Sequence, residues 1–497
     1  MSKRLRVMLV TPPYHSGVVE AAGVWLPLPL VYLAGHARAA GAEVEIYDAM
    51  SLGVDHAAIR RHIEESKPDL VAVTVITATE PDAREICATV KDVNADTVTV
   101  LGGVHPTFCW RDLLDHDPTV DVVVVGEGEH TFAELVRAVA EGGDLSKVRG
   151  LALRKDGKAY TTGARAFATD VDALVPAWDL IDWPRYFYRP HPEGRLAIVS
   201  SARGCKQACA FCSQQKLWQR TWRSRRPEAF VDELEMLRDT HDVRIAMLSD
   251  ETPTVDRARW ERLLNLLIER DLGIELLMET RVDDVLRDRD LLPRYKQAGI
   301  SHIYIGVEAT SQKTLDLYNK ETGVEQGKAA IDLINSHDIV SETSFVLGGV
   351  DETAASIAAT VETAKYYAPD MAFFLALAPW PYADMYPSLA PHVATTDYRR
   401  YNLVEPVLKP RDMTLDEVRK ALHFATGAFF HDKFKNLKKL SPFKRDYMVK
   451  VLKLLIENSY LGKEMHHMAA HASMPEEVRQ MLDESGLLPA AKVAASR

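Results

Sequence analysis

Three cysteines stand close together near the middle of the chain, at Cys205, Cys209 and Cys212. Their C-x3-C-x2-C spacing allows one loop to offer three thiolates to a cubane iron–sulfur cluster, with the fourth iron left free of protein ligands. A structural zinc site needs four ligands, and the segment offers no fourth cysteine and no histidine before His241. A disulfide is disfavoured because the chain has only 5 cysteines, three of them clustered. The spacing predicts a cluster with an open iron, and a zinc site or three buried thiols are the alternatives.

The length and charge of the chain limit what it can be. A chain of 497 residues exceeds the usual size of a single core, so two or three domains are expected. The net charge of −11 argues against a nucleic-acid partner, because binding phosphates needs a clustered basic surface. The first apolar run is too short for a secretory signal or a membrane helix. We therefore expect a cytoplasmic protein without an integral membrane segment, in a reducing compartment.

Residues 1–144 predict one α/β domain. Short apolar strands are predicted at 6–10, 43–47, 70–75 and 97–101, and helices at 28–40, 57–66 and 82–93. This alternation is typical of a doubly wound, Rossmann-like parallel sheet that is covered on both faces. Ligands of such sheets bind at the carboxyl ends of the strands. The glycine pairs in two of these loops, Gly102-Gly103 and Gly126-x-Gly128, allow the backbone to approach a bulky ligand closely.

The remainder of the chain predicts a linker with a small hairpin at 145–195, a second βα series at 196–395 and a helical region at 396–497. In a βα barrel the functional residues lie at the carboxyl ends of the strands. This rule selects Asp250, Glu251, Arg281 and Glu308. The basic run from Lys433 to Arg445 is interpreted as a solvated helix face, with an anionic substrate or a membrane surface as the alternatives.

The cysteine loop and the βα series resemble the radical S-adenosylmethionine (SAM) superfamily, which shares the cysteine spacing and places an aromatic residue where Phe211 stands. The resemblance implies a partial (β/α)6 barrel. It also implies that SAM binds the open iron and is cleaved reductively to a 5′-deoxyadenosyl radical. Asp250 and Glu251 would meet the SAM ammonium, Arg281 its carboxylate, Glu308 the ribose and Phe211 the adenine. Barrel-mouth ion pairs, and support of the cluster loop by Phe211, are the alternatives.

Residues 1–144, placed before such a motif, resemble a cobalamin-binding domain. One branch of that family carries D-x-H-x-x-G, whose histidine is the lower ligand of cobalt, whereas this chain reads D-A-M-S-L-G at 48–53. Because a thioether is a poor ligand for Co(III), Met50 is expected to pack against the corrin and cobalt to lack a histidine below it. The resemblance implies cobalamin contacts at Tyr14, Asp48, Met50, Thr74, Gly102, Gly103, Gly126, Glu127 and Gly128.

Further motifs resemble one particular family over nearly the full chain. They are L-G-G-V-H-P-T-F at 101–108, G-E-G-E at 126–129, A-R-G-C-x3-C-x-F-C-S-Q at 202–214 and Y-N-K-E-T at 318–322. They are similar to the anaerobic magnesium-protoporphyrin IX monomethyl ester oxidative cyclases, which build the isocyclic ring of chlorophylls. The resemblance implies cobalamin, a [4Fe-4S] cluster and SAM as cofactors. It also implies a tetrapyrrole or another biosynthetic intermediate as substrate and a flavodoxin- or ferredoxin-type electron donor. The candidate cations for a propionate are Arg220, Arg223, Arg225 and Arg226.

Two other functions remain open at this point. Cobalamin-dependent radical SAM methyltransferases share the architecture and transfer a methyl group to an unactivated carbon or a phosphinate phosphorus, and fold and cofactors do not decide the outcome. A non-catalytic cobalamin-binding or redox-sensing protein is the second possibility. The presence of three cysteines in place of four, and of Asp250, Arg281 and Glu308 at strand ends, argues against it.

Overall fold

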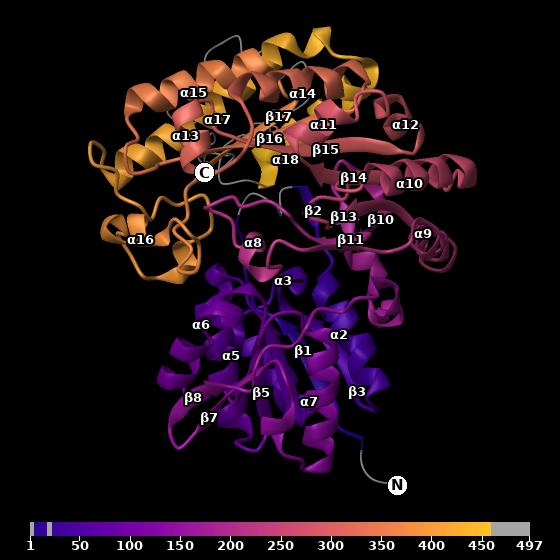
Figure 1. Ribbon diagram of the computed structural model, residues 1–497, viewed down its shortest axis with the longest axis vertical. Helices are drawn as coiled ribbons and strands as arrows, with labels where there is room; N and C mark the ends of the chain where they lie inside the picture. The colour runs from indigo at the N-terminus through magenta and orange to yellow at the C-terminus, as the bar shows by residue number, and fades with distance from the viewer. Residues whose placement is uncertain (1–3, 17–21, 459–497) are drawn as a thin grey trace, which may run out of the picture.

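The computed structural model describes residues 4–16 and 22–458 and contains two sheets whose carboxyl edges face each other (Figure 1). The first sheet has 7 strands in the order β3-β1-β4-β5-β6-β7-β8. Its parallel strands are β1 (Arg6–Thr11), β3 (Glu43–Asp48), β4 (Leu70–Thr74), β5 (Val98–Gly102) and β6 (Val122–Val124). The order of these five strands reverses at β1, as in flavodoxin-like folds, whose ligands bind at such a switch point.

Helices cover both faces of the first sheet, as expected. They are α2 (Leu28–Ala39), α4 (His56–Ser66), α5 (Glu80–Val93), α6 (Val104–His116) and α7 (Glu129–Glu141). Successive residues of β1 point to opposite faces, so Leu9 joins one apolar core with Leu30 and Phe132. Val10 joins the other core, which contains Ile59. The continuous apolar run of β1 therefore reflects burial on both faces, and the doubly wound class is confirmed.

The expected hairpin at 145–195 is part of the first sheet. Strands β7 (Leu151–Lys155) and β8 (Lys158–Thr161) continue the sheet antiparallel to β6, with Val124 opposite Leu151. The sheet therefore extends beyond residue 144, and the hairpin pairs with the edge of β6 that would otherwise be open. A segment of the first domain also crosses over, because β2 (Gly23–Val24) pairs with β9 (Phe187–Tyr188) of the second sheet.

The second sheet is the partial (β/α)6 barrel that the resemblance implied. It has 8 strands in the order β17-β16-β15-β14-β13-β10-β9-β2. The parallel strands are β10 (His191–Val199), β13 (Val243–Leu248), β14 (Glu275–Thr280), β15 (Ile300–Glu308), β16 (Val340–Leu347) and β17 (Met371–Ala376). Helices between them include α9 (Pro227–His241), α10 (Arg257–Arg270), α11 (Val282–Arg287), α12 (Leu292–Gln297), α13 (Gln312–Leu317), α14 (Val324–Ser336) and α15 (Ala354–Tyr367).

The C-terminal helices complete the barrel rather than stand apart from it. Helices α17 (Leu415–Asn436) and α18 (Pro442–Asn458) contribute to the barrel core, and Phe429 of α17 meets Phe374 of β17 with ring centroids 6.1 Å apart. The solvated-face interpretation of the basic run is wrong at two positions, because Lys433 and Lys444 are buried. Lys444 pairs with buried Asp370 at 2.6 Å. Residues 459–497 of the expected helical region lie outside the described residues.

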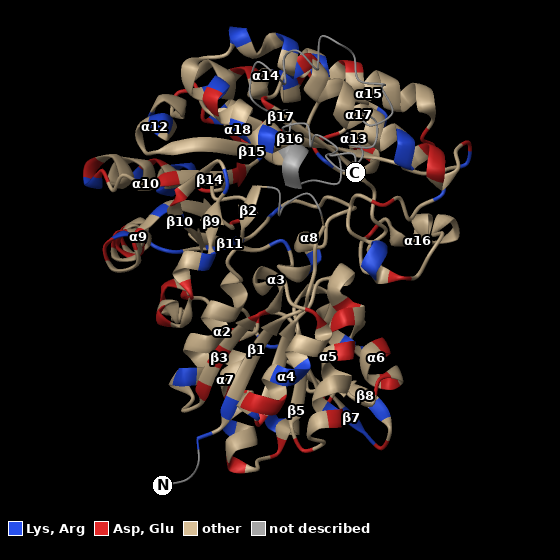
Figure 2. Cartoon of the chain, turned by 180° about the vertical axis from the view of Figure 1, so that it is seen from behind, with Lys and Arg blue, Asp and Glu red and all other residues tan. Residues whose placement is uncertain are grey.

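Charges of both signs are interspersed on the helices of both halves, whereas most strand residues are uncharged (Figure 2). Among the described helices, none combines the length and the apolar character needed to cross a bilayer.

Candidate active site between the two sheets

Three adjoining cavities lie where the two carboxyl edges meet. The edge cavity, of about 440 Å³, is lined by the glycine loops of the first sheet and by β11 (Ala202–Gly204). The loop cavity, of about 650 Å³, lies over the loops after β1 and β3. The barrel cavity, of about 450 Å³, lies inside the strands of the barrel. Thr74 and Ile76 line both the edge and loop cavities, and Trp25, Leu375 and Leu403 line both the loop and barrel cavities.

Eight of the nine expected cobalamin-contact residues line the edge or loop cavity. Tyr14, Met50 and Thr74 line the loop cavity. The edge cavity is lined by Thr74, Gly102, Gly103, Gly126, Glu127 and Gly128. Gly103 has a φ of 110°, and an added Cβ would lie 2.5 Å from the carbonyl oxygen of Val75. Glycine is therefore required at that position, because the loop packs directly against the backbone of Val75.

Asp48 does not line either cavity, in contrast to the expectation. Its side chain accepts hydrogen bonds from Thr11 Oγ1 at 2.5 Å and from Tyr186 hydroxyl at 2.9 Å. It also caps the short helix α3 (Ala49–Leu52) by accepting from Ser51 N. Burial, together with the Asp48 charge, raises the pKa of Tyr186 well above its ordinary value, so the phenol is a stable donor. Asp48 thus holds the loop that carries Met50.

The three cysteines follow β11 on one loop, and none forms a disulfide. Sγ of Cys205 lies 3.7 Å from Thr252 Oγ1, and Sγ of Cys212 accepts a hydrogen bond from Gln214 N at 3.4 Å. Burial raises the pKa of Cys209, and it raises the pKa of Cys212 to about 12. Both thiols therefore hold their protons at neutral pH, and a metal that binds them must displace those protons.

The separation of the sulfurs bears on the zinc alternative. Within the described ranges, the trio of possible metal ligands with atoms all within 4.8 Å of one another is His56, Asp82 and Glu85, at the surface of the first domain. The three cysteines do not form such a trio. At least one pair of their sulfurs therefore lies more than 4.8 Å apart, which is farther than donors that share one zinc ion.

A buried basic group lies beside the cysteine loop, and the sequence reasoning assigned it no role. Nζ of Lys320 lies 2.8 Å from Oε1 of Glu308. Burial lowers the pKa of Lys320, but Glu308 and Cys209 raise it, and the net shift is upward. Arg281 interacts electrostatically with the thiols too, while its Nε donates to Asp283 Oδ1 at 2.8 Å. Lys320 and Arg281 give the cysteine loop the positive surroundings that suit an anionic cluster.

Asp250 and Glu251 differ in where they point. Asp250 is 1% exposed, and its two oxygens accept from Ser201 N at 2.8 Å and Ser201 Oγ at 2.6 Å. Burial raises the pKa of Asp250 to about 6. Glu251 lines the edge cavity and accepts from Gly204 N at 3.0 Å and from Trp218 Nε1 at 2.6 Å. Asp250 therefore holds the segment before the cysteine loop, and Glu251 alone of the two borders a cavity.

Phe211 packs inside the protein rather than projecting from the loop. Its ring meets Tyr318 edge-on with centroids 5.1 Å apart, and it borders an apolar cluster that contains Leu377 and Met385. This arrangement favours the alternative in which Phe211 supports the cluster loop.

The four arginines suggested for a propionate already have other partners. Arg223 pairs with Glu127 at 3.1 Å, and Arg225 pairs with Asp172 at 3.1 Å and with Glu233. Arg226 pairs with Asp172 at 3.0 Å, and Nε of Arg220 donates to Gln215 Oε1 at 3.2 Å. Arg223, Arg225 and Arg226 are each ion-paired with a carboxylate of the protein, and their binding of a propionate stays a prediction.

Arg203 joins the cysteine-loop segment to the first domain. It lies 2.9 Å from Glu127 and 2.7 Å from Glu129, and its guanidinium sits 4.9 Å from the ring centroid of Tyr32. Glu127 also accepts from Ala168 N at 2.7 Å. Burial by itself would raise the pKa of Glu127. Its hydrogen bonds and the two arginines have the larger opposite effect, so the net pKa is lowered and the carboxylate stays charged. The wall of the edge cavity is thus a buried ion-pair network that spans both sheets.

Comparisons with known proteins agree with this two-part site. The model of the B12 binding domain matches residues 14–136, and that of the radical SAM superfamily matches residues 199–364. These matches confirm cobalamin, SAM and a [4Fe-4S] cluster as the expected cofactors. The fold is similar to that of the cobalamin-dependent radical SAM enzyme OxsB, with a TM-score of 0.68 and 17% identity over 98% of this chain and 79% of that one.

Two curated relatives are informative. An uncharacterised methyltransferase of Pyrococcus horikoshii is 28% identical over 86% of this chain and 93% of its own length. The anaerobic magnesium-protoporphyrin IX monomethyl ester cyclase of Rubrivivax gelatinosus is 39% identical over 92% of this chain and 84% of its own length. With this identity along both chains and the two matched domains, the protein is a cobalamin-dependent radical SAM enzyme that belongs to the anaerobic magnesium-protoporphyrin IX monomethyl ester cyclase family.

Proposed function

We propose that this enzyme oxidises a side chain of a magnesium tetrapyrrole monomethyl ester and closes it into a ring. The observation that carries the proposal is that the three cavities adjoin one another through shared lining residues, so that one substrate can border both the glycine loops and the barrel interior, with Arg203 and Gln214 on either side of the cysteine loop in the wall of the edge cavity. The similarity to the cyclase of Rubrivivax gelatinosus supports this substrate class.

The three cysteines are proposed to hold the cluster, with Lys320 and Arg281 as fixed positive charges beside it. Reductive cleavage of SAM at such a cluster supplies a radical that abstracts hydrogen from an unactivated carbon. The side chains that would bind SAM are Arg281 for its carboxylate, Glu308 for its ribose and Glu251 for its ammonium. Asp250 acts through Ser201, and Phe211 through Tyr318, so both are positioning residues.

Cobalamin is proposed to lie against the glycine loops. The backbone at Gly102, Gly103, Gly126 and Gly128 leaves room for a corrin, and Tyr14, Met50 and Thr74 form the neighbouring wall. Met50 N donates to Thr11 Oγ1 at 3.3 Å, which fixes its loop and presents the side chain as an apolar floor. Both oxygens of Glu127 already accept hydrogen bonds from Arg203, Arg223 and Ala168 N, so Glu127 would border the cofactor as part of the ion-pair network in the cavity wall.

The test is the fate of SAM in protein reconstituted under nitrogen with iron, sulfide, hydroxocobalamin and a chemical reductant. With magnesium-protoporphyrin IX monomethyl ester, we expect 5′-deoxyadenosine and an oxidised, cyclised tetrapyrrole. S-adenosylhomocysteine that forms only with cobalamin, together with a methylated product, would assign the enzyme to the methyltransferases, which the relative in Pyrococcus horikoshii represents. We further propose a flavodoxin or ferredoxin as physiological reductant and the cytoplasm as the location.

A further inference from the structure

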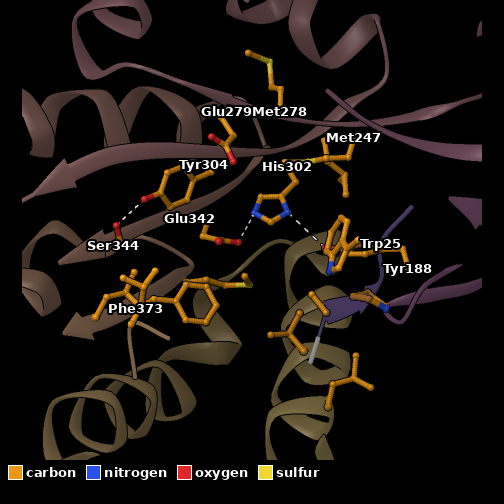
Figure 3. Close-up of a pocket in the computed structure, with 18 residues that line it drawn as sticks. Trp25, Tyr188, Met247, Met278, Glu279, His302, Tyr304, Glu342, Ser344 and Phe373 are labelled. Atoms are coloured by element: carbon orange, nitrogen blue, oxygen red, sulfur yellow. Dashed lines mark hydrogen bonds and ion pairs between the residues drawn. The ribbon is translucent and has the colours of Figure 1, made fainter. Parts of the chain in front are cut away.

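The barrel cavity has a largely apolar wall and one distinct polar corner (Figure 3). Its volume of about 450 Å³ falls within the range of small-molecule pockets but is smaller than a tetrapyrrole macrocycle with its substituents. A side chain of such a substrate fits it. The apolar wall comes mainly from neighbouring strands, at Met247, Leu277, Met278, Met371, Phe373 and Leu375.

Most polar groups on this wall already have partners within the protein. Nε2 of His302 lies 2.8 Å from Oε2 of Glu342, and the Tyr304 hydroxyl lies 2.5 Å from Ser344 Oγ. The dashed lines in Figure 3 mark both pairs. These four side chains come from β15 and β16, which lie side by side in the sheet.

Glu279 differs from its neighbours in having no partner. Its carboxyl points from β14 into the cavity in Figure 3, and no described residue forms a hydrogen bond or ion pair with it. Burial raises the pKa of Glu279 to about 7, and the charges of Glu342, Glu251 and Glu308 add to the effect. A carboxyl in this field carries its proton for much of the time at neutral pH, and in that form it is a hydrogen-bond donor.

We propose that the barrel cavity receives the esterified side chain of the substrate and that Glu279 donates a hydrogen bond to the ester carbonyl. This inference rests on the proposed function and makes it more specific. A tetrapyrrole monomethyl ester has one ester and one free carboxylate. The ester brings an apolar methyl group and one strong acceptor, which match the apolar wall and the single donor.

The free carboxylate does not suit this cavity. It would add a negative charge beside Glu279 and Glu342, and the neighbouring His302 already pairs with Glu342. The cavity therefore accepts the esterified side chain of the substrate, here called the ester arm, and excludes the side chain that carries the free carboxylate.

The selected arm lies near the cysteine loop. Ser344 Oγ is 3.5 Å from Oε2 of Glu308, whose other oxygen binds Lys320 beside Cys209. A chain of polar contacts thus runs from Ser344 on the cavity wall through Glu308 to Lys320, whose charge interacts electrostatically with Cys209. Selection of the ester arm would bring the carbon atoms of that arm, rather than those of the free acid, toward the site of hydrogen abstraction.

The experiment compares wild type with Glu279→Gln and Glu279→Leu in anaerobically reconstituted holoenzyme, with Glu342→Gln as a matched control on the same wall. We expect Glu279→Leu to weaken binding of magnesium-protoporphyrin IX monomethyl ester at least tenfold. Glu279→Gln should weaken it only a few-fold, because an amide N–H still donates. The preference of wild type for the monomethyl ester over the diacid should shrink strongly in Glu279→Leu and only partly in Glu342→Gln, which removes one of the two carboxyl groups beside the cavity and keeps the donor.

The pH dependence separates the carboxyl from a purely steric role. Wild-type affinity should fall as pH rises through about 7, because ionised Glu279 loses its donor proton, and Glu279→Gln should show no such fall. Equal binding by wild type and Glu279→Leu would overturn the inference. So would loss of substrate-free SAM cleavage in Glu279→Leu, since that result would assign Glu279 to SAM.

A small ester tests the cavity independently of the tetrapyrrole. Crystals soaked with methyl 3-phenylpropionate should show its carbonyl against Glu279, and an empty cavity or a carbonyl elsewhere would contradict the inference. If the fragment binds there but no magnesium tetrapyrrole binds wild type at any pH, the proposed function fails and the ester site stands.

Discussion

Arg203, two residues before Cys205, lies 2.9 Å from Glu127 in a glycine loop of the other domain. The side chains of this pair are 11% and 7% exposed, and Glu129 lies 2.7 Å from the same guanidinium. The ion pairs of Arg203 therefore tie the segment that begins the cysteine loop to the wall of the edge cavity.

Replacing Arg203 should weaken this connection. In Arg203→Met, Glu127 keeps only Arg223 and Glu129 loses its cation, so we expect the apoprotein to be destabilised by roughly 3 kcal/mol. Urea unfolding followed by circular dichroism measures the change. Arg38→Met is the control, because its pair with Asp179 is 42% and 63% exposed and should cost less than about 1 kcal/mol. Equal losses in the two variants would show that the interdomain network does not stabilise the fold.

The cysteines of the loop should behave differently from a cysteine of the core. Cys209→Ala should lose the iron–sulfur cluster and all SAM cleavage, because two thiolates do not replace three. Cys87 is buried in the apolar core of the first domain, so Cys87→Ala should keep the full iron content and lose some stability. Iron analysis and electron paramagnetic resonance give the comparison. A full cluster in Cys209→Ala would exclude that residue as a ligand.

The free energy of unfolding should depend on pH in a way that can be assigned to Asp250. Its pKa rises from 3.8 to about 6 on folding because of burial, so the folded protein holds more protons than the unfolded chain between these values. The free energy of unfolding should therefore fall as pH rises from about 4 to 6, by up to about 3 kcal/mol from this group. In Asp250→Asn this contribution is absent, and the stability of the variant relative to wild type should rise over the same window. Urea midpoints from pH 4 to 8 test this, and parallel curves would contradict the assignment.

The fold was largely predictable because its strands are short apolar runs buried on both faces. The strand expected at 43–47 is β3 (Glu43–Asp48), and the helix expected at 82–93 is α5 (Glu80–Val93). The domain boundaries were harder to predict. The hairpin of β7 and β8 belongs to the first sheet only because β7 pairs with β6. The local pattern of a hairpin does not indicate which sheet it joins.

The spacing of Cys205, Cys209 and Cys212 within one loop was enough to predict a cluster site from the sequence, and their role as ligands stays a prediction. It was not predictable where partners come from distant segments. Arg223 resembles a free anion-binding residue in the sequence, but its partner Glu127 lies 96 positions earlier. No sequence pattern pointed to Glu279 as a binding residue. Its proposed role depends on a cavity formed by several strands, in which no described residue pairs with its carboxyl.

The pair of Lys320 and Glu308 allows the sharpest test of electrostatics beside the cysteine loop. Both side chains are nearly inaccessible, at 8% and 10% exposure, so Lys320→Met leaves Glu308 as a buried charge without a cation. We expect a loss of roughly 3 to 5 kcal/mol in the stability of the apoprotein and at least tenfold weaker SAM binding. Lys328→Met, which breaks the pair with the exposed Asp332, should change neither by much.

The double variant Lys320→Met/Glu308→Gln separates charge from shape. If the unpaired carboxylate causes the loss of stability, the double variant should be more stable than Lys320→Met, because no buried charge remains uncompensated. SAM binding should stay weak in the double variant, since Glu308 is then absent as a partner for the ribose. A double variant as unstable as the sum of the two single changes would mean that Lys320 stabilises the barrel through packing, and its charge would then have no special role beside the cysteines.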